Sequence, residues 1–164
     1  MSESNPPHFS WKRRIEFCET DAAGIAHFST FLLLMEQSEH ALFRSLGLSV
    51  FSSAAHHSIA VASEFVGVDL QAITWPRVRC EVEYLAPARF EEELIDEVCI
   101  ERMGAKSVTF VHRLARGSQL IAKGTMVSVC SVKDPATGNL VGQVIPDPIR
   151  LALAKYAVQD GPRS

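Results

Sequence analysis

The pattern of apolar and polar residues predicts a short strand followed by one long helix in the first third of the chain. From Phe9 to Phe17 apolar residues recur on one parity, interrupted by Arg13, as expected for a strand with one buried face. From Phe28 to Leu46 they follow the spacing of a helix of about five turns, and Gly47 stands where a C-terminal cap belongs. The apolar face is wider than one stripe, which predicts a central helix embraced by a sheet.

Four strand-like segments follow the helix. The first alternates from Val78 to Tyr84, with Val78, Cys80, Val82 and Tyr84 on one face. The other three run over 92–102, 106–116 and 119–132, with separators short enough for consecutive antiparallel hairpins. A turn-rich exit at 133–142 and a short helix at 149–158 complete the pattern. The segment from Leu48 to Pro76 is the least regular, and we expect a loop there with a strand or short helix inside it.

A strand, a buried helix and a run of antiparallel strands define an α+β fold, a curled sheet around one long central helix. We expect a single domain over residues 1–164, with a core from about 9 to 133 and a tail from 134 to 164. Such a sheet has edges, and long edge strands are commonly protected by pairing with a second subunit. We therefore expect a homodimer or homotetramer, with the active site at the dimer interface.

Composition and charge exclude several classes of protein. The chain has 164 residues, of which 47% are hydrophobic, so it can form a core without disulfides or metal. A formal net charge of -3 gives no overall field that would attract nucleic acid or an anionic membrane. The four cysteines form no Cys-x-x-Cys pair, and we expect free thiols.

No targeting or membrane segment is recognisable. Residues Met1 to His8 are polar and lack the apolar stretch of a secretory signal. The longest nearly apolar run, Phe28 to Met35, is far shorter than the ~20 residues that a membrane helix needs. These features predict a cytoplasmic protein.

The junction between the first strand and the helix carries the clearest chemical signal. Asp21 is followed by small residues up to Gly24, which would let a substrate approach closely. A helix start offers unpaired N–H groups and a partial positive charge to an oxygen that becomes negative. A carboxylate beside these donors can attack a carbonyl or deprotonate water. The competing interpretation is that Asp21 merely caps the helix or forms an Asx turn.

This junction lies within a longer segment that resembles a known family. Residues 17–31, Phe-Cys-Glu-Thr-Asp-Ala-Ala-Gly-Ile-Ala-His-Phe-Ser-Thr-Phe, with Glu36, are similar to the signature of the 4-hydroxybenzoyl-CoA thioesterase group of the hotdog superfamily. Residues 82–89, Val-Glu-Tyr-Leu-Ala-Pro-Ala-Arg, and Ser107 with Phe110 resemble its later blocks. The resemblance covers about residues 10 to 132. It implies a hotdog fold and hydrolysis of an aromatic or aliphatic acyl-CoA to the free acid and CoA.

The resemblance also implies roles for particular residues. Asp21 matches the catalytic aspartate, acting as nucleophile or general base, and Phe28 matches the residue whose backbone N–H polarises the thioester carbonyl. Many relatives carry His, Asn or Tyr at the position of Phe28, so no side chain helps here. His27, one place earlier, is a further catalytic candidate, or else a histidine packed at the helix start. Gly24 and Phe31 are candidates for substrate binding.

Coenzyme A is part of the substrate, so no separate cofactor is expected, but its phosphates need basic groups. Arg89, Arg102 and Lys106, with Ser107, stand near strand ends, which we expect to cluster at one rim. The alternative is that these charges are simply solvated. We assign no metal, because His56 and the adjacent His57 have no third ligand at a zinc-like spacing.

Two further positions carry expectations of their own. His112 interrupts an apolar parity, and we expect a hydrogen-bonded histidine in the core. Glu36 is expected to be a structural acceptor or an interface residue. Two other functions stay open: a hotdog dehydratase or hydratase, and a non-catalytic module that binds acyl thioesters. The acyl group cannot be read from the sequence, because the segment 48–75 is longer than in compact relatives and could roof the pocket.

Overall fold

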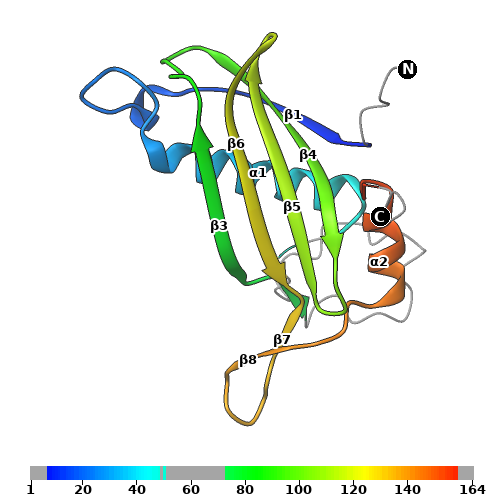
Figure 1. Ribbon diagram of the computed structural model, residues 1–164. Coiled ribbons are helices and arrows are strands. Elements are labelled where there is room, and N and C mark those ends of the chain that lie inside the picture. The colour runs from blue at the N-terminus through cyan, green and yellow to red at the C-terminus, as the bar shows by residue number, and fades with distance from the viewer. Residues whose placement is uncertain (1–6, 49, 51–72, 159–164) are drawn as a thin grey trace.

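The computed structural model describes residues 7–48, 50 and 73–158, and its main feature is a five-stranded antiparallel sheet with a helix against one face (Figure 1). The helix α1 (Phe28–Ser45) has 18 residues, which is about five turns. The sheet order is β1-β4-β5-β6-β3. Its strands are β1 (Phe9–Arg14), β3 (Arg77–Tyr84), β4 (Glu93–Met103), β5 (Ser107–Arg116) and β6 (Gln119–Val129). The predicted α+β arrangement of an antiparallel sheet and a helix is therefore confirmed.

Smaller elements lie at the ends of the sheet. A 3-10 turn, η1 (Phe17–Glu19), leads from β1 toward α1. A second sheet of order β2-β7-β8 lies at the other end of β6. The remaining elements are β2 (Ile73–Thr74), β7 (Ser131–Lys133), β8 (Leu140–Gly142) and the helix α2 (Asp147–Ala154).

Several expected boundaries are wrong by a few residues. The first strand ends at Arg14, and the expected strand over 119–132 is divided into β6 and β7 at Cys130. The helix expected at 149–158 spans Asp147–Ala154. The central helix ends close to its expected boundary, because Gly47 takes the left-handed conformation with φ of 72° and closes the last turn. Most of the segment between Leu48 and Pro76, with the strand or short helix expected inside it and the two adjacent histidines, lies outside the described residues.

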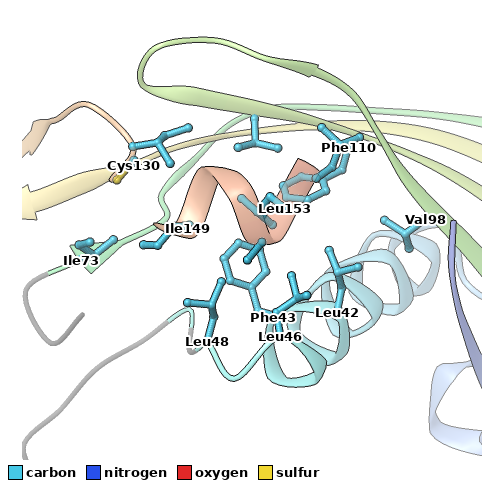
Figure 2. Packing of buried hydrophobic residues seen from close by; sticks show 14 residues of the cluster. Leu42, Phe43, Leu46, Leu48, Ile73, Val98, Phe110, Cys130, Ile149 and Leu153 are labelled. Carbon is cyan, nitrogen blue, oxygen red and sulfur yellow. The ribbon is translucent and has the colours of Figure 1, made fainter. Parts of the chain in front are cut away.

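The buried side chains of α1 join the sheet in two clusters. The C-terminal half of the helix packs Leu42 and Phe43 against strands β4 and β5 and against α2, as Figure 2 shows for Phe110 and Leu153. The N-terminal half packs another set against β4, β5 and β6: Phe31, Leu34, Met35, Leu94, Leu114, Ile121 and Met126. At Gly124 a side chain would meet the Sδ of Met35 at 2.3 Å, so glycine lets the helix approach β6 closely.

Strand β3 is an edge strand, and every one of its side chains is at least partly exposed. The expected alternation of inward and outward side chains along this strand is wrong at Val78, the first residue of the expected strand. A β-bulge between Arg77 and Arg79 breaks the parity, so Val78 is 63% exposed while Arg77 turns toward the helix. In the described part of the chain β3 pairs only with β6, which leaves its outer edge open.

Candidate active site

The loop that carries Asp21 is closed by its own backbone. The Asp21 N–H donates to Ile25 O at 2.9 Å, and the Gly24 N–H donates to Asp21 O at 3.0 Å. Gly24 has a φ of 71°, a conformation that side chains other than glycine rarely adopt. The short loop therefore needs glycine at this position, and it holds the Asp21 backbone in one orientation.

One carboxylate oxygen of Asp21 is engaged and the other is available. Its Oδ1 accepts a hydrogen bond from the Ala23 N–H at 2.8 Å, which is an Asx turn. Within residues 7–48, 50 and 73–158, Oδ2 has no hydrogen-bond partner. The Asx turn and the catalytic interpretation are therefore compatible, because the turn fixes the side chain through one oxygen and leaves the second free to react.

The helix start beside this carboxylate has a free donor. His27 is the N-cap residue, and its Nδ1 accepts from the Ser29 N–H at 3.3 Å and lies 2.7 Å from Ser29 Oγ. The Thr30 N–H donates to His27 O at 2.9 Å. No described group accepts from the Phe28 N–H, the first of the helix. His27 is thus occupied at Nδ1 as a cap, and of its two ring nitrogens only Nε2 could face a substrate.

An ion pair below the loop holds the helix start in place. Arg13 Nη2 lies 2.6 Å from Glu19 Oε1, and its Nη1 donates to Gln37 Oε1 at 2.7 Å. The carbonyl of Glu19 accepts from the His27 N–H at 2.8 Å and from Thr30 Oγ1 at 3.0 Å. Arg13 therefore ties β1 to both the loop and α1. Arg13 is not among the site residues expected from the sequence, although its charge interrupts the apolar positions of the first strand.

A cavity of about 500 Å³ opens beside Asp21, and Phe28 and Phe31 line it from the helix. Tyr84 lines it from β3; its hydroxyl donates to Phe28 O at 2.9 Å, and its ring meets Phe31 edge-on at 5.4 Å. Burial raises the pKa of Tyr84, which keeps this hydroxyl a donor. The remaining wall is mostly apolar: Ile25, Ala26, Leu85, Ala86 and Pro87. Gly24 is not among the residues that line this cavity, and its place in the structure is the turn after Asp21. Its expected role in substrate binding stays a prediction.

The basic candidates do not meet at one rim within a single chain, and this expectation is wrong. Arg89 lies near the loop, where its backbone pairs with Ile25. Arg102, Lys106 and Ser107 lie at or beside the β4–β5 turn, at the far end of an 11-residue strand that is roughly 35 Å long. Successive hairpin turns fall at alternate ends of a sheet, as Figure 1 shows for the β4–β5 and β5–β6 turns. The connection that carries Arg89 precedes β4, so it lies at the end opposite the β4–β5 turn.

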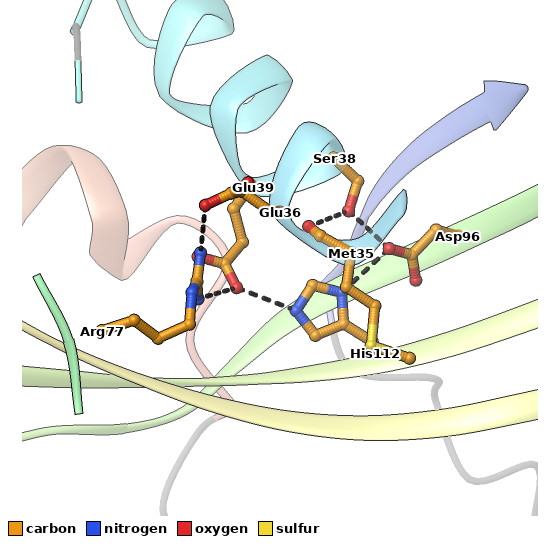
Figure 3. A network of polar contacts seen from close by, with 7 residues as sticks. All are labelled: Met35, Glu36, Ser38, Glu39, Arg77, Asp96 and His112. Atoms are coloured by element: carbon orange, nitrogen blue, oxygen red, sulfur yellow. Dashed lines mark hydrogen bonds and ion pairs between the residues drawn. The ribbon is translucent and has the colours of Figure 1, made fainter. Parts of the chain in front are cut away.

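A network of charges lies in the core under the middle of α1 (Figure 3). His112 is fully buried between two carboxylates, with Nδ1 at 2.8 Å from Asp96 Oδ2 and Nε2 at 3.1 Å from Glu39 Oε1. The expectation of a hydrogen-bonded core histidine is therefore confirmed. Burial alone would lower the pKa of His112, but the hydrogen bonds and charges of Asp96 and Glu39 outweigh it and raise the pKa to about 9.

Three further features concern the thiols, the helices and the metal-binding side chains of the described residues. All four cysteines are free thiols. Among the residues described, no helix is long and apolar enough to cross a membrane. No group of three or more metal-binding side chains occurs within the same residues.

Comparison with known proteins identifies relatives that are named as hydrolases of acyl-CoA thioesters. No protein-family model matches the chain. It is 26% identical to a 1,4-dihydroxy-2-naphthoyl-CoA hydrolase of Synechococcus sp. (strain CC9605) over 126 residues, 75% of this chain and 76% of that protein. It is 25% identical to the acyl-CoA thioester hydrolase YbgC of Escherichia coli O157:H7 over 130 residues, 77% and 84% of the two chains.

Solved structures share the fold. A 1,4-dihydroxy-2-naphthoyl-CoA thioesterase from Synechocystis superposes with a TM-score of 0.69 at 19% identity, covering 90% of this chain and 96% of that one. A gentisyl-coenzyme A thioesterase superposes with a TM-score of 0.67 at 23% identity, covering 89% and 99%. The protein therefore has the hotdog fold. Its resemblance to the acyl-CoA thioesterases of that fold, first indicated by the residues around Asp21, is confirmed.

Proposed function

We propose that this protein is a thioester hydrolase that converts an acyl-CoA to the free acid and CoA. The observation that carries the proposal is the pairing of Asp21, which has one free carboxylate oxygen, with the unpaired N–H of Phe28 at the start of α1. Both residues line the same apolar cavity. The names of the relatives in sequence support the same activity.

The chemistry needs only these two groups and water. The Phe28 N–H, helped by the positive end of the helix, binds the thioester carbonyl oxygen as it becomes negative. Asp21 Oδ2 then either attacks the carbonyl carbon or takes a proton from a water that attacks it. The C–S bond breaks with its electron pair on sulfur, and the CoA thiolate leaves. In the first route water then hydrolyses the acyl-aspartyl anhydride and regenerates the carboxylate.

We further propose that the acyl group is aromatic. Three of the pocket's side chains are aromatic, namely Phe28, Phe31 and Tyr84, and flat rings pack well against such walls. Two of the related proteins are named for aromatic acyl groups, 1,4-dihydroxy-2-naphthoyl and gentisyl.

A dimer would bring the separated basic residues to the site. Strand β3 has an open edge, and Val78, Tyr84 and Leu85 expose apolar surface along and beyond it. If two copies pair antiparallel through β3 about a two-fold axis, the ends of one sheet are reversed relative to the other. The β4–β5 turn of the second copy, with Arg102 and Lys106, then lies at the same end as Asp21 of the first. We propose that these residues bind the CoA phosphates across the interface.

Mixing two inactive variants tests this shared site. One variant carries Asp21→Ala, and the other carries Arg102→Ala with Lys106→Ala. Random exchange of subunits would make half of the dimers mixed, each with one intact site, so about a quarter of the wild-type activity should return. Two inactive variants that stay inactive after exchange, or a protein that remains monomeric in solution, would contradict the shared site.

The activity itself is tested with a panel of aromatic and aliphatic acyl-CoA substrates and a thiol-reactive dye. We expect release of free CoA thiol, fastest with aromatic acyl groups. An enoyl-CoA is assayed in parallel for hydration of its double bond. Hydration without thiol release would favour the dehydratase class, and tight binding of acyl-CoA without either reaction would favour a binding module.

A further inference from the structure

The charge network under α1 runs from the core to the edge of the sheet (Figure 3). Asp96 on β4 and Glu39 on α1 flank His112 on β5. Glu39 then binds Arg77 of β3 through both carboxylate oxygens, at 2.8 and 2.9 Å. Charges of alternating sign thus link the helix to three strands, and the last of them is the edge strand.

The positive charge of His112 is required by its surroundings. Asp96 is 2% exposed; its Oδ2 accepts from both His112 and Ser38, and its Oδ1 has no partner in the part of the chain described. Glu39 is 3% exposed. Glu39 is also paired with Arg77, but among the described residues Asp96 faces no cation other than His112. A neutral ring would therefore leave the buried Asp96 carboxylate without a counter-charge.

We propose that His112, as a buried cation, is a positioning residue that holds α1 at a fixed distance from β3 and so sets the width of the pocket beside Asp21. This inference rests on the proposed thioesterase function, because it assigns His112 a part in the same site. His112 touches no substrate. It acts through Glu39 and Arg77, which fasten the helix to the edge strand.

Few contacts join α1 to β3. At one end the Glu39–Arg77 pair joins the two elements, and Glu36 adds an oxygen 3.8 Å from Arg77 Nη2. At the other end Tyr84 donates to Phe28 O, within the pocket wall. Near Arg77 a cavity of about 250 Å³ lies between the helix and the strand, so there is space for the distance between α1 and β3 to change. Loss of the Glu39–Arg77 ion pair would therefore change the distance between Phe28 and Tyr84 in the pocket wall.

The groups that face His112 make its charge depend on pH in a defined direction. From β4 it faces Asp96, from α1 Glu39, and through Glu39 it meets Arg77 of β3. On β6 its neighbour across the sheet is Gly124, which has no charge. The pKa of His112 is raised to about 9, so the imidazolium is present at neutral pH and is lost as the pH rises through 9.

The test compares the wild type with Asp96→Asn, which keeps the shape and removes one anion. Glu97→Gln, the next residue of β4 and partly exposed, is the matched control. In the wild type we expect KM for acyl-CoA to be constant at neutral pH and to rise about tenfold as the pH passes 9, with kcat less affected. In Asp96→Asn the midpoint should fall by at least about one pH unit, because a nearby anion contributes one to three units. Spontaneous thioester hydrolysis is subtracted at each pH.

Nuclear magnetic resonance of the wild type provides a second readout that needs neither activity nor a variant. The ring nitrogens of His112 should both be protonated at pH 7, and amide exchange of residues 28–31 should accelerate beyond the ordinary effect of base above pH 9. A neutral His112 at pH 7, or the same KM midpoint in Asp96→Asn as in the wild type, would overturn the inference. Absence of CoA release by the wild type at every pH would instead overturn the proposed function. The resonance data would still test whether His112 is protonated at pH 7.

Discussion

The carboxylate of Asp21 before α1 and the carboxylates of Asp96 and Glu39 under its middle differ in their exposure to water and in whether a cation lies beside them. At the helix start Asp21 is partly exposed, with one oxygen held by an Asx turn and the other free. Under the middle of the helix Asp96 and Glu39 are buried against a cation. The comparison separates two uses of the same chemical group. A reacting carboxylate must keep an unpaired oxygen in contact with substrate and water, whereas a structural one must be neutralised because it is removed from water.

The largest expected effect on stability is the removal of a buried carboxylate. Glu39→Ala leaves His112 and Arg77 without their shared partner and should lower the free energy of unfolding by about 3–5 kcal/mol. The matched control is Glu36→Ala on the same helix, whose side chain is 44% exposed, with an expected cost below about 1 kcal/mol. Chemical denaturation of both variants measures the difference. Equal losses would remove the distinction between the two carboxylates.

A smaller effect is expected from pH. The pKa of His112 is about 9 in the folded protein, above the ordinary histidine value of 6.5. A raised folded pKa contributes stability that is fully present below the unfolded pKa and is lost as the pH rises through the folded one. The free energy of unfolding should thus fall by at most about 3 kcal/mol between pH 6.5 and 9.5. Denaturation curves across this range would show no such fall if His112 were neutral in the folded state.

A substitution in the active-site loop should lower activity more than it lowers stability. Gly24→Ala places a side chain at a φ of 71° and should cost about 1 kcal/mol of folding free energy. Because the loop orients Asp21, hydrolysis should fall by roughly tenfold, since small misplacement of a reacting group slows catalysis strongly. Gly138→Ala, at a φ of 74° in the remote β7–β8 turn, is the control and should leave hydrolysis unchanged. A similar loss of activity in both variants would mean that the loop does not orient the carboxylate.

The sequence was informative where one face of an element is buried. The period of α1 and the alternation of β4, β5 and β6 predicted their positions closely, because each buries one side against the core. Strand β3 was predicted as an element, but its bulge at Arg77 was not visible in the pattern. An edge strand with little burial places few constraints on its parity.

The site was predictable only where it is local in sequence. Asp21, the start of α1 and Phe31 come from one segment, and the structure does bring them to one cavity. The contribution of Arg13, Gln37 and Tyr84 depends on how distant segments pack, which a single pattern does not contain. The error on Arg89 and Arg102 had a topological cause, because Arg89 precedes β4 and Arg102 stands near the end of β4, so the length of this strand separates them.

The most direct test of the central claim is the rate of CoA release by Asp21→Asn beside Asp134→Asn. Both aspartates make an Asx turn through one carboxylate oxygen, at 2.8 Å from the N–H two residues later, but Asp134 lies in the remote β7–β8 turn. Asp21→Asn should lower kcat by about a thousandfold with little change in Tm, as loss of a reacting acid–base group does. Asp134→Asn should hydrolyse at the wild-type rate. Turnover by Asp21→Asn within a few-fold of the wild type would contradict the assignment of Asp21 as the reacting carboxylate.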